Sequence, residues 1–108
     1  MPAFARVLPL DGLAPGAAVA AAIDGSALAL FNVGGSIYAI DDFCIRCGGS
    51  LAAGTLSGTL VACSGCDWEY DVITGSVNGI PALRIDRFEV RIAGPDVLVA
   101  TPLERLAR

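Results

Sequence analysis

Two short segments, Cys44-Ile45-Arg46-Cys47 and Cys63-Ser64-Gly65-Cys66, contain all four cysteines of the chain, and fifteen residues separate them. A two-residue gap lets a tight turn aim both sulfurs of a segment at one point. Two such turns facing each other offer four thiolates in a tetrahedral arrangement, which suits zinc or iron. A doubled C-x-x-C at this spacing rarely arises by chance. The sequence therefore predicts a metal site with these four cysteines as ligands.

Other uses of cysteine explain the pattern less well. Four cysteines in two short motifs are poorly explained as small buried hydrophobic residues. Two local disulfides would fit an exported protein. A catalytic redox C-x-x-C usually opens a helix and occurs once, whereas Gly48-Gly49 and the strand-like Trp68-Glu69-Tyr70 follow the motifs here. The metal interpretation is therefore favoured over disulfides and over free thiols.

The composition indicates one globular domain over residues 1–108, long enough to bury a core. Apolar residues make up 55% of the chain and charged residues 17%, which argues against disorder. The net charge of −4 argues against nucleic acid as a partner, because phosphate binding needs clustered Lys or Arg. No apolar run reaches the ~18 residues of a membrane span, and the N-terminus lacks a signal-peptide pattern. We therefore predict a cytoplasmic protein without a membrane segment, and a reducing cytoplasm favours bound metal over disulfides.

The sequence contains no histidine. The usual general base, the commonest metal ligand and any Ser–His or Cys–His nucleophile pair are therefore missing. A metal saturated by four thiolates also leaves no open position for a substrate. The chain is predicted not to be an enzyme by itself.

Gly and Pro residues interrupt the chain at short intervals, and the apolar segments between them are mostly five to eight residues long. This pattern predicts an all-β, antiparallel sandwich or barrel. A stretch over 51–56 is predicted to be irregular, and the tail over 102–108 to be one helical turn or frayed. The strands are expected over 4–8, 17–23, 28–33, 37–40, 59–62, 68–71, 83–92 and 97–100.

Several sequence segments, spread over nearly the whole chain, resemble those of a known family. They are Phe31-Asn32-Val33-Gly34-Gly35-Ser36-Ile37-Tyr38-Ala39-Ile40, Gly48-Gly49-Ser50-Leu51 after Cys44, Gly58-Thr59-Leu60-Val61 before Cys63, Trp68-Glu69-Tyr70-Asp71 with Thr74-Gly75 after it, and Asp96-Val97-Leu98-Val99. Together they resemble the Rieske-type ferredoxin family. The resemblance implies a Rieske-like antiparallel β fold with a small metal-binding subdomain, about residues 43–82, that carries the two C-x-x-C loops.

The chain departs from this family at the cluster ligands. The family motif is C-x-H followed by C-x-x-H, and Arg46 and Cys66 stand at the two histidine positions, with Cys47 as an additional thiol. A Rieske [2Fe–2S] centre holds one iron by two histidines, so this chain cannot build it. Cys66 is shorter than an imidazole and Cys47 is displaced along its loop, which favours one four-cysteine, rubredoxin-like ion over an all-cysteine [2Fe–2S] cluster. Iron is slightly favoured over zinc as that ion.

The resemblance also suggests roles for residues around the site. Tyr70 matches a position whose hydroxyl bonds a ligand sulfur in some Rieske proteins, and Pro81 matches a loop that shields the cluster. Arg46 is expected either to offset the charge of four thiolates or to be a solvated loop residue. Trp68 is expected to pack below the loops. Tyr70 could instead be a strand residue packed in the core. Pro81 could instead lie in an ordinary turn.

Two further features belong to the predicted metal end. Gly48, Gly49 and Gly65 are expected to leave backbone N–H groups free to point at sulfur, because ligand loops bend sharply. Acidic residues form a candidate rim for docking a basic partner, with solvated loop charges as the alternative. These acidic residues are Asp41, Asp42, Asp67 and Glu69.

Three functions are consistent with the sequence. The first is a one-electron carrier between a flavin reductase and an oxygenase or reductase component. The second is a non-redox interaction module in which zinc clamps the two loops. The third is an accessory subunit of a larger reductase. The retained thiols argue against the third, and the family resemblance favours the first.

Overall fold

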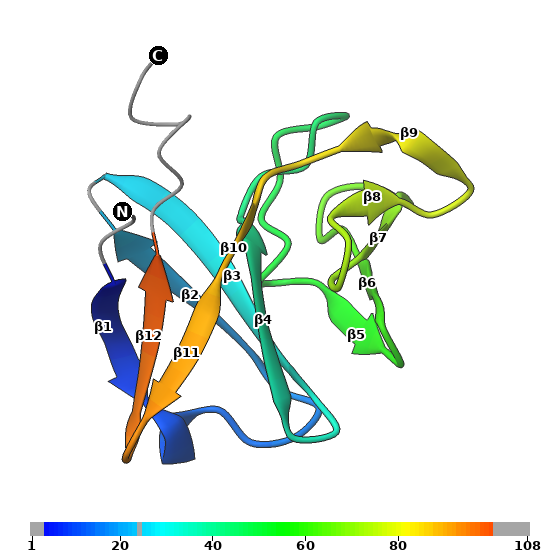
Figure 1. Ribbon diagram of the computed structural model, residues 1–108. Coiled ribbons are helices and arrows are strands. Elements are labelled where there is room, and N and C mark those ends of the chain that lie inside the picture. The colour runs from blue at the N-terminus through cyan, green and yellow to red at the C-terminus, as the bar shows by residue number, and fades with distance from the viewer. Residues whose placement is uncertain (1–3, 24, 101–108) are drawn as a thin grey trace.

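The computed structural model describes residues 4–23 and 25–100, which fold almost entirely into β-strands and turns (Figure 1). The strands pair antiparallel in three sheets, which confirms the predicted all-β architecture. In the described part of the chain, no helix has the length and apolar character needed to cross a membrane. The tail predicted over 102–108 lies outside the described residues.

Two sheets form the left-hand body of the molecule in Figure 1. The first has the order β1-β12-β11 and the second the order β10-β4-β3-β2. A 3₁₀ turn, Leu10–Gly12, follows the first strand. The strands are β1 (Phe4–Pro9), β2 (Ala18–Ile23), β3 (Ser26–Val33), β4 (Ser36–Asp41), β10 (Arg87–Phe88), β11 (Val90–Ala93) and β12 (Asp96–Ala100).

A third sheet lies to the right of this body in Figure 1 and has the sequential order β5-β6-β7-β8-β9. The sheet is built from short strands because Gly and Pro turns interrupt the sequence every few residues. Its strands are β5 (Thr55–Ser57), β6 (Leu60–Ala62), β7 (Glu69–Asp71), β8 (Ser76–Val77) and β9 (Ile80–Arg84).

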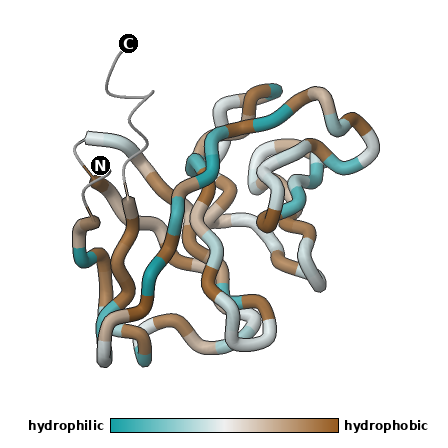
Figure 2. The backbone as a smooth tube through the Cα atoms, in the orientation of Figure 1, coloured by the Kyte–Doolittle hydropathy of each residue, from teal (hydrophilic) through white to brown (hydrophobic). Residues whose placement is uncertain are grey.

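Strand β3 is buried on both faces and so connects the two parts of the core. Leu28 and Leu30 belong to the apolar cluster between the first two sheets, whereas Ala29 and Phe31 belong to the cluster beneath the third sheet. Alternate strand residues point to opposite faces, so only an uninterrupted apolar run can serve both clusters. Figure 2 shows hydrophobic residues recurring along the strands, and a mixture of hydrophilic and hydrophobic residues from β9 into β11.

The segment predicted as one strand over 83–92 is divided into three. The chain leaves the third sheet at Arg84, pairs briefly with β4 and then joins β12. Phe88 is therefore 6% exposed while Ile92 is 45% exposed, although their spacing predicts a shared face. The local alternation contains no signal for this change of sheet. The prediction over 51–56 was also wrong in part, because β5 begins at Thr55.

Gly54 is expected to be essential for the start of the third sheet. A Cβ there would collide with the carbonyl oxygen of Ala62 and lie 3.2 Å from that of Leu51. Because both neighbours are backbone atoms, Gly54→Ala should destabilise the protein by about 1–3 kcal/mol or more in urea unfolding. At Gly12 the nearest atom to an added Cβ is 3.6 Å away, so Gly12→Ala serves as the matched control. Equal unfolding midpoints for the two variants would refute this steric account.

Candidate metal centre

The two C-x-x-C loops are positioned by the ends of two strands. The first loop follows β4, and the second connects β6 to β7 in the third sheet. Cys44 and Cys63 are buried, with 0% and 6% exposure, and both form part of the apolar cluster beneath that sheet. Cys66 is half-buried and Cys47 is exposed. The inner pair therefore anchors the loops in the core, and the outer pair faces solvent.

The four sulfurs converge on one point. All four Sγ atoms lie within 4.8 Å of one another. Cys44 and Cys66 are 3.7 Å apart at their sulfurs, and Cys47 and Cys63 are 3.5 Å apart. A tetrahedral ion with metal–sulfur bonds of about 2.3 Å holds its sulfurs about 3.8 Å apart. The residues present therefore fit a four-thiolate metal site.

The first loop is held by its own backbone and by an aspartate. The N–H of Cys44 donates to the carbonyl of Gly49, and the N–H of Gly48 donates to the carbonyl of Cys44. The Asp42 carboxylate accepts 2.8 Å hydrogen bonds from the Ser50 hydroxyl and the Ala52 N–H. Sequence reasoning placed Asp42 on the acidic rim and missed this bracing role, since Asp and Ser eight residues apart give no local signal.

A second contact missed from the sequence connects the two loops. The Ser64 hydroxyl donates a 2.7 Å hydrogen bond to the carbonyl of Ser50, which lies in the first loop. In the second loop, the N–H of Cys63 donates to the carbonyl of Trp68. These bonds fix how the two C-x-x-C turns face each other, and only the tertiary fold creates the first of them.

Two of the three glycines direct N–H groups at sulfur as predicted. Gly49 N–H donates to Cys47 Sγ at 3.4 Å, and Gly65 N–H donates to Cys63 Sγ at 3.3 Å. Gly48 instead adopts φ +77° and bonds a carbonyl oxygen. An added Cβ at Gly65 would lie 3.0 Å from the sulfur of Cys47. Both sulfur-directed glycines are thus needed for close approach to the site.

Tyr70 lies at the base of the site and is fully buried. Its hydroxyl donates to Cys44 Sγ at 3.3 Å and accepts the Ile45 N–H at 3.0 Å. Burial, followed by the hydrogen bond to the Cys44 sulfur, raises the pKa of Tyr70. The phenol therefore stays protonated and able to donate to sulfur.

The thiols resist simultaneous ionisation. Burial alone would raise the pKa of Cys44, but the Tyr70 hydroxyl and two backbone N–H groups outweigh it and lower that pKa to about 6. For Cys47, the Gly49 N–H favours the thiolate, yet the neighbouring sulfurs and desolvation raise its pKa to about 12. Desolvation and the Cys44 thiolate likewise raise the pKa of Cys66 above its ordinary value, against the Trp68 N–H. A bound cation must displace these protons, so metal affinity should increase with pH.

The other candidate residues are Arg46, Trp68 and Pro81. The Arg46 guanidinium carbon is 5.4 Å from the centroid of the Trp68 ring, a cation–π contact beside the site. Trp68 itself is partly buried against the cluster beneath the third sheet. Pro81 is exposed on β9, in a shallow hollow that it shares with Asp71 and Asn78. Its shielding role remains a prediction.

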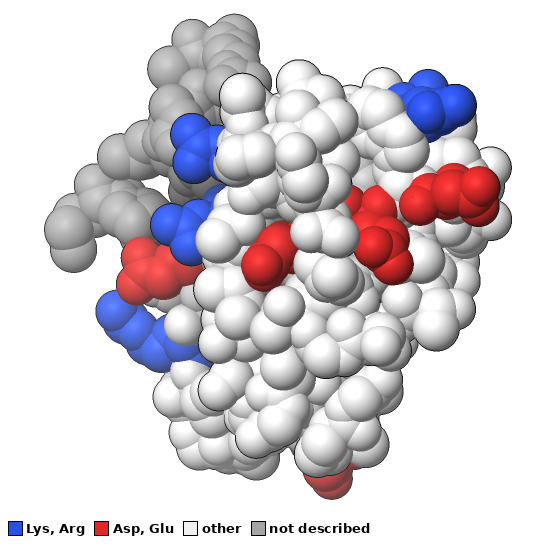
Figure 3. All heavy atoms as spheres, turned by 90° about the vertical axis from the view of Figure 1, so that its right-hand side faces the viewer, with Lys and Arg blue, Asp and Glu red and all other residues white. Residues whose placement is uncertain are grey.

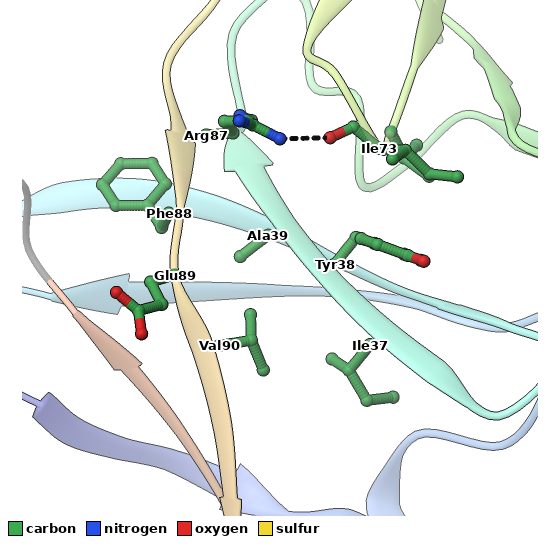
Figure 4. Close-up of a pocket in the computed structure, with 9 residues that line it drawn as sticks. Ile37, Tyr38, Ala39, Ile73, Arg87, Phe88, Glu89 and Val90 are labelled. Carbon is green, nitrogen blue, oxygen red and sulfur yellow. Dashed lines mark hydrogen bonds between the residues drawn. The ribbon is translucent and has the colours of Figure 1, made fainter.

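The hollow in Figure 4 is separate from the metal centre. It has a volume of about 450 Å³ and opens between β4, the β10–β11 segment and the turn at Val72 and Ile73. Arg87 donates a 2.9 Å hydrogen bond across it to the Ile73 carbonyl. None of the four cysteines lines it, so the hollow provides no access to the sulfurs.

The surface around the third sheet carries negative charge. Residues 43–82 contain one basic residue, Arg46, against Asp67, Glu69 and Asp71. Figure 3 shows acidic side chains across the middle of the corresponding face, with basic ones toward its edges. Four thiolates on a divalent ion would add a further net charge of about −2.

Comparisons with known proteins agree with this fold. The family model for the Rieske [2Fe-2S] domain matches residues 3–93. The biphenyl dioxygenase ferredoxin subunit of Pseudomonas sp. (strain KKS102) is 35% identical over 98 residues, covering 89% of this chain and 90% of that protein. The solved ferredoxin of carbazole 1,9a-dioxygenase from Nocardioides aromaticivorans IC177 has a TM-score of 0.85 and 29% identity, covering 92% of this chain and 98% of that one.

A second similar structure comes from a complex of reduced oxygenase and oxidized ferredoxin in carbazole 1,9a-dioxygenase. It has a TM-score of 0.82 and 29% identity, and the match covers 90% of this chain and 92% of that one. These relatives are ferredoxin components, which carry electrons and are not the catalytic subunits, so the prediction of a carrier is confirmed. The extent of the family match and the 35% identity to a ferredoxin subunit lead to one conclusion: this chain belongs to the Rieske [2Fe–2S] domain family.

Proposed function

We propose that this chain is a one-electron carrier in which Cys44, Cys47, Cys63 and Cys66 hold a single iron ion. The observation that carries the proposal is the convergence of four Sγ atoms within 4.8 Å in a Rieske-family chain that has no histidine. The iron would supply a one-electron couple. The surrounding chain would hold it away from water on the inner side and leave it near the surface on the Cys47 side.

The distances between the sulfurs favour a single ion over an all-cysteine [2Fe–2S] cluster. Two irons bridged by sulfide require thiolates on different irons to lie farther apart than thiolates on one iron. Here the sulfur pairs across the loops are separated by 3.5 and 3.7 Å, close to the edge of a single tetrahedron. The family norm is [2Fe–2S], so metal and sulfide counts decide between the two.

The proposed partners follow from the relatives and from the surface. One relative is the ferredoxin subunit of a dioxygenase, and another was solved in complex with its oxygenase. We therefore propose a reductase as the electron donor and an oxygenase or reductase component as the acceptor. The exposed Phe43 and Ile45 beside Cys47, together with the acidic face, would suit a basic partner with an apolar centre. Four free thiols suit the reducing cytoplasm.

A structural zinc site is the second candidate. Cys44 and Cys63 are core residues of the cluster beneath the third sheet, so any bound ion would also stabilise that part of the fold. A closed four-thiolate zinc site has exactly that structural role and no redox chemistry. Zinc would make the chain an interaction module or an accessory subunit.

The test is metal and acid-labile sulfide analysis, with a visible spectrum, on protein isolated from its native cells. One iron per chain, no labile sulfide and a reversible one-electron couple are expected. Two irons with two sulfides per chain would replace the single ion by a [2Fe–2S] cluster. A colourless protein with one zinc would establish the structural alternative.

Tyr70→Phe should lower the reduction potential of the iron. The hydroxyl donates to Cys44 sulfur, and this bond is stronger when the reduced metal leaves more charge on sulfur. If this hydrogen bond is ~1 kcal/mol stronger in the reduced state than in the oxidised state, its loss lowers the reduction potential by on the order of 40 mV for one electron. Protein-film voltammetry measures this shift. Tyr38→Phe, on the half-buried strand β4, is the matched control and should leave the potential unchanged.

A further inference from the structure

Cys47 is the most exposed of the four cysteine residues. Cys47 is exposed, whereas Cys44 and Cys63 are buried and Cys66 is half-buried. Two glycines flank it: an added Cβ would lie 3.0 Å from this sulfur at Gly65 and 3.2 Å at Gly49. Because neither residue has a side chain, each approaches the sulfur with backbone atoms alone. A small solute can therefore approach Cys47 more readily than the inner cysteines.

The partner available to Cys47 lies in the opposite loop. Its Sγ is 3.5 Å from that of Cys63, and the other close pair, Cys44 and Cys66 at 3.7 Å, also joins the two loops. Gly49 borders both sulfurs of the first pair, since an added Cβ there would be 3.3 Å from Cys63 Sγ. The packing thus places the sulfur of an exposed cysteine 3.5 Å from the sulfur of a buried one in the opposite loop.

We propose that Cys47 is an oxidation site for hydrogen peroxide and that Cys63 converts the product into a disulfide joining the two loops. This inference rests on the proposed single-ion, four-thiolate site. In the first step the Cys47 sulfur, which would be a thiolate while it ligates the ion, attacks peroxide; an S–O bond forms, the O–O bond breaks and hydroxide leaves. Sulfur is oxidised by two electrons, and peroxide is reduced.

In the second step the Cys63 thiolate attacks the Cys47 sulfenic acid. The S–S bond forms, the S–O bond breaks, and a second hydroxide leaves. Overall, two thiolates and one peroxide give one disulfide and two hydroxides. The metal loses two of its four ligands and is released, while Cys44 and Cys66 remain thiols. A dithiol reductant restores the site by thiol–disulfide exchange.

The experiment uses the full chain loaded with one zinc, because zinc has no redox chemistry that would consume peroxide. Peroxide is added in the presence of a chromogenic zinc chelator, and disulfides are mapped by digestion and mass spectrometry after alkylation. The first disulfide is expected between Cys47 and Cys63, with one zinc released per disulfide. A first disulfide within either C-x-x-C motif, or zinc release with Cys47 still reduced, overturns the proposal.

Three variants separate this route from simple loss of a ligand. Cys47→Ser and Cys66→Ser each remove one outer thiol, but only Cys47→Ser should slow peroxide-driven thiol loss, by roughly tenfold. Cys66→Ser should still form the Cys47–Cys63 disulfide. Gly65→Ala keeps the four cysteines but crowds the Cys47 sulfur, so its zinc content is measured first; with one zinc bound, it should also slow the reaction. Equal oxidation rates for Cys47→Ser and Cys66→Ser would refute the assignment.

The outcome is independent of the test of the proposed function. The number of metal ions and labile sulfides per chain is measured separately, on protein isolated from its native cells. If the chain holds one ion and the disulfide forms elsewhere, only the oxidation site is wrong. If the chain holds two irons and two sulfides, the single-ion site itself fails.

Discussion

Replacing Arg46 and Cys66 with histidine, together with Cys47→Ser, is expected to convert the proposed single-ion site into a Rieske [2Fe–2S] centre. The substitutions place imidazoles at the two positions where the family has them and remove the additional thiol. Iron per chain should increase from about one to about two, accompanied by two labile sulfides, since a Rieske centre holds one iron by two cysteines and the other by two histidines. Iron and sulfide analysis with electron paramagnetic resonance measures the change.

The expected increase in iron per chain follows from the length of the ligand side chains. An imidazole extends farther from the backbone than a thiolate, so histidine ligands leave space for a second iron and its sulfide bridges. The reduction potential of the new centre should fall within about −150 to +300 mV. Cys47→Ser alone is the control and should hold neither two irons nor labile sulfide. A triple variant that still binds a single ion would show that the loops, and not the ligands, set the nuclearity.

Removing the metal is expected to loosen residues 43–82 and to leave the two-sheet body folded. The sulfurs of Cys44 and Cys63 are part of the cluster beneath the third sheet, whereas the cluster between the first two sheets contains no cysteine. A structural four-thiolate ion contributes ~10–16 kcal/mol in small zinc peptides, as much as the whole stability of a typical domain. Chelation should therefore abolish amide protection in the two loops and in β5–β9.

Hydrogen exchange with mass spectrometry measures this difference segment by segment. Peptides from β1 and β12 should remain protected after chelation, and protection in the loops should return when metal is added back. Strand β3 should show an intermediate loss, since it packs on both clusters. This experiment also tests the predicted subdomain over 43–82. Uniform loss of protection across the chain would show one cooperative unit instead.

Much of the metal centre could be predicted from local sequence. The spacing of Cys44, Cys47, Cys63 and Cys66 is sufficient to predict that two turns each present two sulfurs, and the flanking glycines indicate backbone N–H groups near sulfur. The absence of histidine excludes the ligand set typical of the family without any structure. These conclusions hold because C-x-x-C chelation and glycine conformation depend on a few neighbouring residues.

The remaining features depend on residues that are distant in sequence. The change of sheet between Phe88 and Val90 is set by which strands have free edges, so the alternation over 83–92 could not predict it. Asp42 braces the first loop through Ser50, a contact with no local signal. The bond from Tyr70 to Cys44, 26 residues away, was expected only from the family resemblance and not from any local pattern. The exposure of Cys47 beside the buried Cys63 also arises from the packing of the two loops. The sequence by itself thus determined the all-β class and the four cysteines that converge at the candidate site, because these follow from local spacing and turn chemistry. The tertiary structure decided which sulfurs are buried, which are open and which side chains support them, because burial and hydrogen bonding join segments that are far apart along the chain.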